Sequence, residues 1–205
     1  MALTLMKVAP YGLEGLGKGL KYYADLAAQR ISPPLLKEAE SYIKKQDNKK
    51  ILKNVQFILS SPQKRAIQTA KLMRMRISKN IPVRISKSLN EVPFSLDGLD
   101  PKTYSSTVAR SKFLQDFISD KLLEQRRAVK DRIKEVLKAN AKGGILCVTH
   151  TFLMKIIETC IKYPDLFEHP KKLARNFNVN QRLFEYCGML KLAGKEIKQT
   201  LNKLQ

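Results

Sequence analysis

Short apolar runs alternate along the chain with longer stretches in which apolar residues recur at helical spacing. The apolar runs predict strands at Leu3–Val8, Val55–Leu59, Ile81–Ile85 and Ile145–Val148. Helical spacing predicts helices at Pro34–Lys45, Pro62–Arg76, Ser105–Asn140 (long enough for two helices) and Phe152–Lys162. Alternating strands and helices predict an α/β fold, a three-layer sandwich with a mostly parallel central sheet and helices on both faces.

The remaining segments have weaker patterns. The glycine-containing segment Ala9–Arg30 is expected to be a long loop, and because it follows the first strand it would lie at the ligand-binding edge of the sheet. Leu183–Tyr186 and Gly188–Leu192 are weak strand candidates, followed by a helical or extended tail. A chain of 205 residues, 43% of them hydrophobic, can bury a sizeable core. We expect a single domain, 1–205, with 100–142 as a helical insert.

The segment after the second strand has the chemistry of an anion site. Ser61 can cap a helix, and Pro62 suits the first helical position. Lys64 and Arg65 then fall in the first turn, where the backbone N–H groups already carry partial positive charge. Cations at this end of a helix indicate that an anion is bound there, and phosphate is the usual one.

Two further polar residues end neighbouring segments of the predicted sheet. His150 follows the strand Ile145–Val148, and Glu91 follows the strand Ile81–Ile85. An arginine, a histidine and a carboxylate around helix N-termini suit phosphoryl chemistry, because cations bind the oxygens and an acid protonates the leaving group.

These segments also resemble a known family. Residues Ser60-Ser61-Pro62-Gln63-Lys64-Arg65-Ala66-Ile67-Gln68-Thr69-Ala70 resemble the Ser-Ser-Pro-x-x-Arg-Ala-x-Gln-Thr-Ala motif of the histidine phosphatase superfamily, which has the phosphoglycerate-mutase-like fold. Ile31–Ala39, Leu89-Asn90-Glu91 and Val148-Thr149-His150 resemble further family motifs in the same order. The resemblance extends from about Leu3 to Leu192.

The resemblance implies a role for each matching residue. Arg65 would bind phosphate together with Ser61 and His150. Glu91 would be the proton donor, and His150 would be the second histidine of the pocket. Structural roles are open for each: Arg65 in a surface basic run, Glu91 paired with a lysine, His150 at a helix start. We expect neither a cofactor nor a metal ion.

The family's first motif is missing. Members have Arg-His-Gly straight after the first strand, and that histidine attacks phosphorus. Here the spacing places Pro10 at the arginine and Tyr11 at the nucleophile, and no histidine precedes His150. The other histidine, His169, lies in a polar turn. Tyr11 would be an atypical nucleophile, since a phenol with a pKa of ~10 needs a base beside it. We favour the interpretation of Tyr11 as an aromatic plug.

The formal charge is +21, far from the ~2–8 that keeps a small domain soluble. Between Asn48 and Asn90 there are eleven Lys or Arg residues and no acid. Those outside the pocket are candidates for nucleic-acid binding: Lys49, Lys50, Lys53, Lys64, Lys71, Arg74, Arg76, Lys79, Arg84 and Lys87. Lysine used as a general solubiliser is the alternative, but glutamate does not accompany it.

The sequence leaves three functions open. The favoured one is a non-catalytic histidine-phosphatase-fold protein, a pseudoenzyme, that binds RNA or the ribosome through its basic surface. The second is an active phosphatase or mutase on an acidic phosphorylated substrate. The third is a scaffold for an acidic protein. The three unpaired cysteines and the lack of a membrane span favour the cytoplasm. The oligomeric state stays open.

Overall fold

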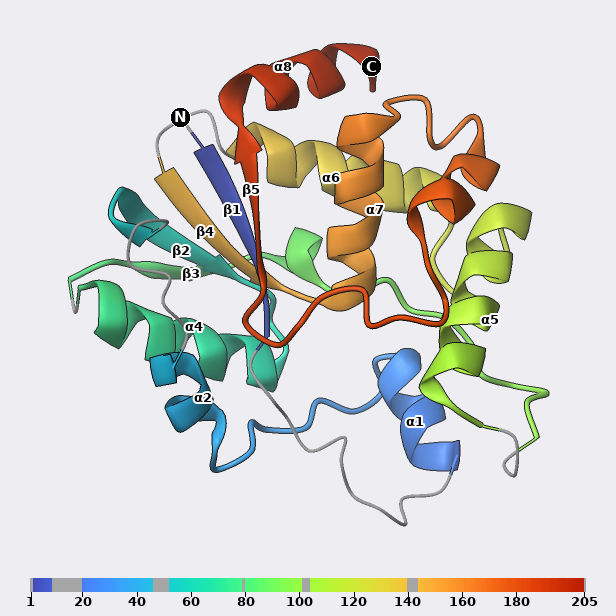
Figure 1. Ribbon diagram of the computed structural model, residues 1–205, viewed down its shortest axis with the longest axis horizontal. Helices are drawn as coiled ribbons and strands as arrows, with labels where there is room; N and C mark the ends of the chain where they lie inside the picture. The colour runs from blue at the N-terminus through green and yellow to red at the C-terminus, as the bar shows by residue number, and fades with distance from the viewer. Residues whose placement is uncertain are drawn as a thin grey trace.

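A five-stranded sheet lies at the centre of the computed structural model, which describes residues 2–8, 20–45, 52–78, 80–100, 104–139 and 144–204 (Figure 1). The strands are β1 (Ala2–Lys7), β2 (Val55–Ser60), β3 (Val83–Ile85), β4 (Gly144–Thr149) and β5 (Met189–Ala193). Their order is β3-β2-β4-β1-β5, and β5 alone among them runs antiparallel, beside β1. The predicted mostly parallel sheet is therefore confirmed.

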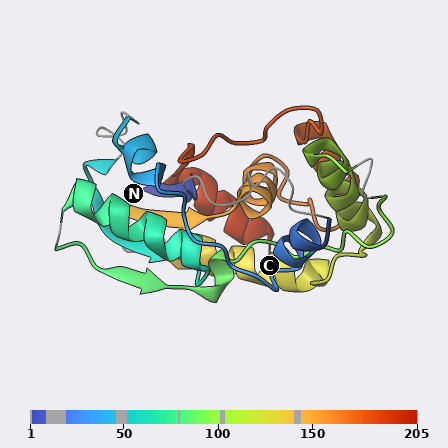
Figure 2. The ribbon, with the colours of Figure 1, turned by 90° about the horizontal axis from the view of Figure 1, so that it is seen from below.

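Helices cover both faces of the sheet, as predicted. One face carries α2 (Ala39–Lys45) and α4 (Lys64–Ile77), and the other carries α6 (Arg126–Ala139), α7 (Thr151–Lys162) and α8 (Gly194–Lys203). The helix α5 (Ser106–Ser119) stands at the end of the molecule opposite β3, with α1 (Leu20–Ala27) near it (Figures 1 and 2). Two 3₁₀ helices, η1 (Lys87–Leu89) and η3 (Pro170–Asn176), complete the described elements.

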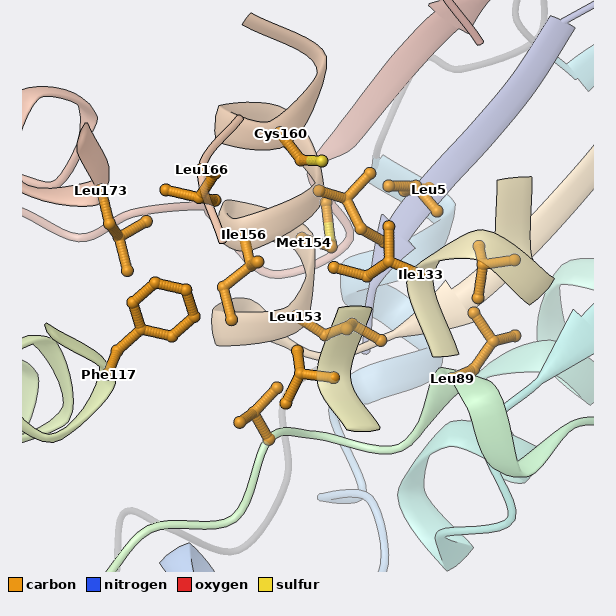
Figure 3. Packing of buried hydrophobic residues seen from close by; sticks show 14 of the residues in the cluster. Leu5, Leu89, Phe117, Ile133, Leu153, Met154, Ile156, Cys160, Leu166 and Leu173 are labelled. Atoms are coloured by element: carbon orange, nitrogen blue, oxygen red, sulfur yellow. The ribbon is translucent and has the colours of Figure 1, made fainter. Parts of the chain in front are cut away.

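The alternation of side chains along the central strands builds two cores. Leu5 of β1 and Cys147 of β4 face α6 and α7, where Ile133, Leu153 and Ile156 are fully buried (Figure 3). On the other face, the strand residues Met6, Ile58, Leu146 and Val148 pack against α2 and α4. The helices contribute Ile43, Ala66, Ala70 and Met73 to this core. Because both faces of β4 are buried, the strand is apolar almost throughout, and its sequence therefore predicts a buried strand.

The expectation of a loop over Ala9–Arg30 was wrong in its second half. Residues 9–19 lie outside the described part, but Leu20–Ala27 forms α1. Glycines at 12, 15, 17 and 19 suggested a loop, whereas 20–27 contains none. Tyr23, Ala24 and Ala27 pack against the larger core and so anchor this helix.

The strand predicted at Leu183–Tyr186 is absent, and a turn stands there instead. Cys187 has a φ of 57°, and the Gly188 N–H donates to the Glu185 carbonyl at 2.9 Å. The left-handed residue separates this segment from β5, which matches the second weak prediction within a residue. The tail forms α8 rather than an extended segment.

The helix predicted from Pro34 begins only at Ala39. The Leu35 N–H donates to the Gln68 side chain at 2.8 Å, which ties the preceding residues to α4 in a non-helical path. The predicted pair of helices between 105 and 140 is present as α5 and α6. No helix among the described residues is long and apolar enough to cross a membrane.

Candidate functional site

The segment that leads from β2 into α4 buries an arginine. Ser61 Oγ accepts a hydrogen bond from the Gln63 N–H at 3.3 Å, and Ser32 Oγ accepts one from the Lys64 N–H at 2.7 Å. These hydroxyls satisfy N–H groups next to the start of α4, which begins at Lys64 with Gln63 at the N-cap position. The prediction that Ser61 caps the helix and that Pro62 is its first residue was therefore wrong by two residues. Arg65 is only 2% exposed, so it does not belong to a surface basic run.

Four side chains form a hydrogen-bonded series at the carboxyl edge of the sheet. Arg65 Nη2 lies 3.4 Å from Nδ1 of His150, and His150 Nε2 lies 3.1 Å from Oγ of Ser61. Ser61 in turn donates to Oδ1 of Asn90 at 2.9 Å. The series therefore joins three of the predicted residues, Ser61 and Arg65 after β2 and His150 after β4, and adds Asn90, which was not predicted, from the segment after β3.

The series fixes the protonation of His150. A guanidinium only donates, so Nδ1 of His150 accepts a hydrogen bond from Arg65. Nε2 therefore carries the ring proton and donates a hydrogen bond to Ser61 Oγ. Burial holds the pKa of His150 well below its usual value, and the charges of Arg65, Arg132 and Lys7 lower it further. His150 is thus a neutral ring with both nitrogens engaged, which suits it to orient neighbours rather than to attack phosphorus.

Glu91 sits at the N-terminus of α7. Its carboxylate accepts hydrogen bonds from the N–H groups of Val92 at 3.1 Å, Phe152 at 3.1 Å and Leu153 at 2.8 Å. Removal from water raises the pKa of Glu91, while these N–H groups and the Arg65 charge oppose the rise. The carboxyl is therefore held by backbone, not by the lysine that one reading of the sequence offered.

Lys7, at the end of β1, was not identified from sequence. It is 7% exposed, donates from Nζ to the Phe184 carbonyl at 2.9 Å, and lies 4.4 Å from the centre of the Tyr186 ring. Burial, and next the charge of Arg182, lowers the pKa of Lys7 to about 8. The sequence signal that could have identified Lys7 is a single lysine at the end of an apolar strand.

The strand register shows which residues end β1 beside the pocket. Lys7 pairs with Thr149, and the Val8 N–H donates to the Thr149 carbonyl at 3.0 Å. Lys7 and Val8 thus run alongside Thr149 and His150. Pro10 and Tyr11, which the spacing assigned to the missing motif, lie outside the described residues, so that assignment stays a prediction.

Residues far apart in sequence hold the segment that carries Glu91. Arg132 of α6 donates to the Asn90 carbonyl at 2.8 Å, and Thr149 Oγ1 donates to the Leu89 carbonyl at 2.7 Å. Gln29 donates from its side chain to the Glu91 carbonyl and accepts from Gln63 at 2.8 Å. No sequence motif pointed to these contacts, because each joins elements that meet only in the fold.

A cavity of about 330 Å³ opens beside this site. Arg65 and Glu91 are among the residues that line it, whereas Ser61 and His150, which were also predicted to bind phosphate, are not. Its other lining residues come mainly from α1, the segment after Glu91 and the start of α5: Tyr23, Leu26, Ala27, Phe94, Leu96, Tyr104, Ser106, Ala109 and Phe152. A ligand in the cavity would therefore meet the guanidinium and the carboxyl together.

The candidate nucleic-acid residues divide into three groups. Exposed side chains are Lys53, Lys64, Lys71, Arg84 and Lys87. Arg74 and Arg76 are half-buried, and Arg76 donates to the Ile43 carbonyl, which gives it a structural role. Lys49, Lys50 and Lys79 lie outside the described residues.

A buried arginine, a neutral imidazole and a carboxyl thus meet at the carboxyl edge of a mostly parallel sheet, where α/β proteins bind their ligands. The sequence model of the histidine phosphatase superfamily (branch 1) matches residues 28–182. The chain belongs to this superfamily. The match begins after Ala27 and so does not include the segment where the Arg-His-Gly motif is expected.

Solved structures share the fold. A mycobacterial glucosyl-3-phosphoglycerate phosphatase in complex with VO3 is 13% identical, with a TM-score of 0.61 over 94% of this chain and 92% of that one. Phosphoserine phosphatase from Entamoeba histolytica, in complex with 3-phosphoglyceric acid, is 17% identical, with a TM-score of 0.57 over 93% and 89%. At these identities the likeness shows the phosphoglycerate-mutase-like fold. None of the curated proteins compared with the chain matches it.

Proposed function

We propose that this chain is a phosphatase that binds a phosphate monoester against Arg65 and hydrolyses it without a second imidazole. The observation that carries the proposal is the shared cavity, in which the buried guanidinium of Arg65 and the carboxyl of Glu91 face one space. A guanidinium binds phosphate oxygens with charge-assisted hydrogen bonds, and burial, by raising the pKa of Glu91, favours the protonated form that a general acid needs.

In this proposal a water molecule or an atypical nucleophile such as Tyr11 attacks phosphorus. The bond from phosphorus to the ester oxygen breaks, and Glu91 gives its proton to that oxygen, so the alcohol leaves uncharged. With water as the nucleophile, Glu91 regains a proton from the attacking water, and inorganic phosphate is released. With Tyr11 as the nucleophile, the phenol loses its proton to solvent and forms a phosphotyrosine, and water then breaks the bond from phosphorus to the tyrosine oxygen, which restores the phenol and releases inorganic phosphate. Arg65 neutralises the charge on the phosphoryl oxygens throughout.

The lack of a second histidine that could serve the pocket predicts slow turnover. His150 and His169 are the only two histidines, and His169, whose side chain is 65% exposed, lies in the turn after α7. A single stabilising donor of this kind is typically worth ~10²–10³ in rate, so a pocket lacking the family's attacking pair is expected to be correspondingly weaker.

The test is hydrolysis of p-nitrophenyl phosphate by purified protein. We expect turnover that Arg65→Ala abolishes and that Lys71→Ala, an exposed cation on the same helix, leaves unchanged. Loss with Tyr11→Phe would assign the attack to the tyrosine, and full retention would assign it to water. No turnover by the wild type, or turnover that survives Arg65→Ala, would overturn the proposal.

Two double substitutions compare the two placements of the missing motif. Lys7→Arg with Val8→His follows the register of β1 beside β4, and Pro10→Arg with Tyr11→His follows the spacing. The pair that increases turnover identifies the position from which an imidazole reaches a phosphate held by Arg65. Activity found only in one of these variants would favour a non-catalytic wild type.

The exposed cations favour a second candidate function. Lys53, Lys64, Lys71, Arg84 and Lys87 are exposed and belong to an acid-free stretch. Binding of RNA or the ribosome through phosphate contacts would fall with salt, with log affinity dropping by ~0.7–0.9 per neutralised phosphate for each tenfold rise in salt concentration. Sedimentation with ribosomes or structured RNA across a salt series tests this, and salt-insensitive or absent association would remove it.

Two further proposals accompany the second candidate. If the partner is an acidic protein instead, a complex isolated from cells would survive nuclease treatment. A cytoplasmic location, as the sequence suggested, is supported by Cys147, Cys160 and Cys187, which are all free and buried.

A further inference from the structure

The cavity beside Arg65 and Glu91 is aromatic on its other sides. The rings of Tyr23 and Tyr104 stack with centroids 4.8 Å apart and planes 23° apart. Phe94 and Phe152 meet edge to face at 5.3 Å. Leu26, Leu96 and Ala109 line the space between these elements. The walls are therefore suited to a flat apolar group.

Two of the cavity's described lining residues are charged. Among the described lining residues, Arg65 is the only cation and Glu91 the only anion. Arg65 suits one phosphate group, and the lining residues that the structure describes include no second cation for a further carboxylate. An acidic organic part, as in 3-phosphoglycerate, would be stripped of water against apolar walls without a matching partner, at considerable cost.

We propose that the substrate is a phosphate monoester whose organic part is apolar, such as an aryl group, held between the Tyr23–Tyr104 stack and the Phe94–Phe152 pair. The proposal rests on the proposed function, because the phosphate end is the one bound at Arg65. The cavity volume of about 330 Å³ lies near the lower end for ligand pockets, which suits a small organic group of one or two rings.

The elements that line the cavity give this specificity a structural basis. Glu91 accepts from the Phe152 N–H, so the carboxyl and one aromatic wall are fixed to each other. Burial raises the pKa of Tyr104 to about 12, and the phenol therefore stays neutral beside an apolar ligand. A substrate seated on these rings would hold its ester oxygen toward Glu91 and its phosphate toward Arg65.

Calorimetric titration of the full chain with 1-naphthyl phosphate, 3-phosphoglycerate and inorganic phosphate tests the inference. We expect 1-naphthyl phosphate to bind at least ~10-fold more tightly than 3-phosphoglycerate, because its ring buries apolar surface. If inorganic phosphate binds but 1-naphthyl phosphate binds no more tightly than 3-phosphoglycerate, this inference is wrong and the proposed function stands. If none of the three binds, the proposed function fails as well.

Substitutions in the cavity locate the preference. Ala109, 8% exposed in α5, lines the cavity, and Ala109→Phe would fill it. We expect that variant to lose the preference for the naphthyl ester and to bind inorganic phosphate within ~2-fold of the wild type. Ala174→Phe, at an exposed position in η3, is the matched control.

Ser106→Trp covers the case in which Ala109→Phe does not fold. Ser106 is exposed at the start of α5 and also lines the cavity, so a larger side chain is accommodated at its rim. It should lower naphthyl phosphate affinity in the same way. If either folded variant retains the full preference, the ring binds elsewhere and the inference is wrong.

Discussion

Arg65 Nη2 lies 3.4 Å from His150 Nδ1, and this contact holds a buried imidazole in its neutral form beside a buried guanidinium. Of these two side chains, Arg65 alone therefore carries a positive charge. Because the imidazole proton on Nε2 is donated to Ser61, His150 orients the pocket and does not supply a free lone pair. This arrangement agrees with the proposed phosphate site, in which the attacking group would be a residue other than His150 or a water molecule.

We predict that His150 makes the protein less stable in acid. Its folded pKa lies well below the unfolded value of about 6.5, so as pH falls through 6.5 the unfolded chain takes up a proton that the folded chain refuses. The free energy of unfolding should fall in that window. His150→Gln should remove this part of the pH dependence in urea-unfolding measurements at about pH 7.5, 6.5 and 5.5.

The same substitution at His169 is the control for His150. His169 is exposed, and its Nε2 lies 3.8 Å from the Asp165 carboxylate. If His150→Gln keeps the wild-type pH dependence, or if His169→Gln flattens it equally, the account of His150 as a buried neutral ring is wrong.

Glu91→Gln tests the carboxyl at the start of α7. An amide cannot accept all three N–H donors as the carboxylate does, so at neutral pH the variant should lose about 1–3 kcal/mol of that hydrogen bonding. The raised pKa of Glu91 acts in the opposite direction. Between the unfolded and folded pKa values the folded chain holds a proton that the unfolded chain has lost, so wild-type stability declines as pH rises.

The stability difference between wild type and Glu91→Gln should therefore shrink as pH rises above about 4.5. Guanidinium-unfolding curves measured as a function of pH give this difference directly. A stability difference that grows with pH would mean that the three N–H donors lower the pKa of Glu91 more than burial raises it. The carboxyl would then be ionised in the folded protein. Glu185→Gln, on an exposed turn side chain, serves as the matched control.

Lys7→Met tests the buried ammonium at the end of β1. The pKa of Lys7 is lowered from 10.5 to about 8, so between these values the unfolded chain holds a proton that the folded chain has lost. Wild-type stability therefore rises with pH across this window, by up to ~3 kcal/mol relative to the methionine variant. Thermal or urea unfolding of both proteins at about pH 7.5 and 9.5 measures the difference, and a constant difference would contradict the assignment.

Most of the fold was predictable because its signals are local. The run Ile145–Val148 is apolar because β4 is buried on both faces. Ser61-Pro62 indicated the strand-to-helix turn, although α4 begins two residues later, at Lys64. The first helix was missed because glycines next to it dominated the pattern. The false strand at Leu183–Tyr186 arose because the turn at Cys187 has no sequence signal.

The candidate site was predictable only in part, for a physical reason. Arg65, Glu91 and His150 each follow a strand-end motif, and parallel strands bring their carboxyl ends to one edge. Lys7, Arg132 and Gln29 were missed because they act through contacts across the fold. The aromatic cavity was missed because Tyr23 and Tyr104 meet only in three dimensions.

The affinity of Arg65→Ala for inorganic phosphate, measured by calorimetry beside the wild type and Lys71→Ala, tests the central claim most directly. Arg65 is buried at the cavity and Lys71 is exposed on the same helix, so the two substitutions remove equal charge from different places. Loss of a charge-assisted bond worth ~1.5–3 kcal/mol predicts binding about 10- to 100-fold weaker for Arg65→Ala and nearly unchanged for Lys71→Ala. Equal weakening by both variants, or wild-type affinity in Arg65→Ala, would contradict a phosphate site at Arg65.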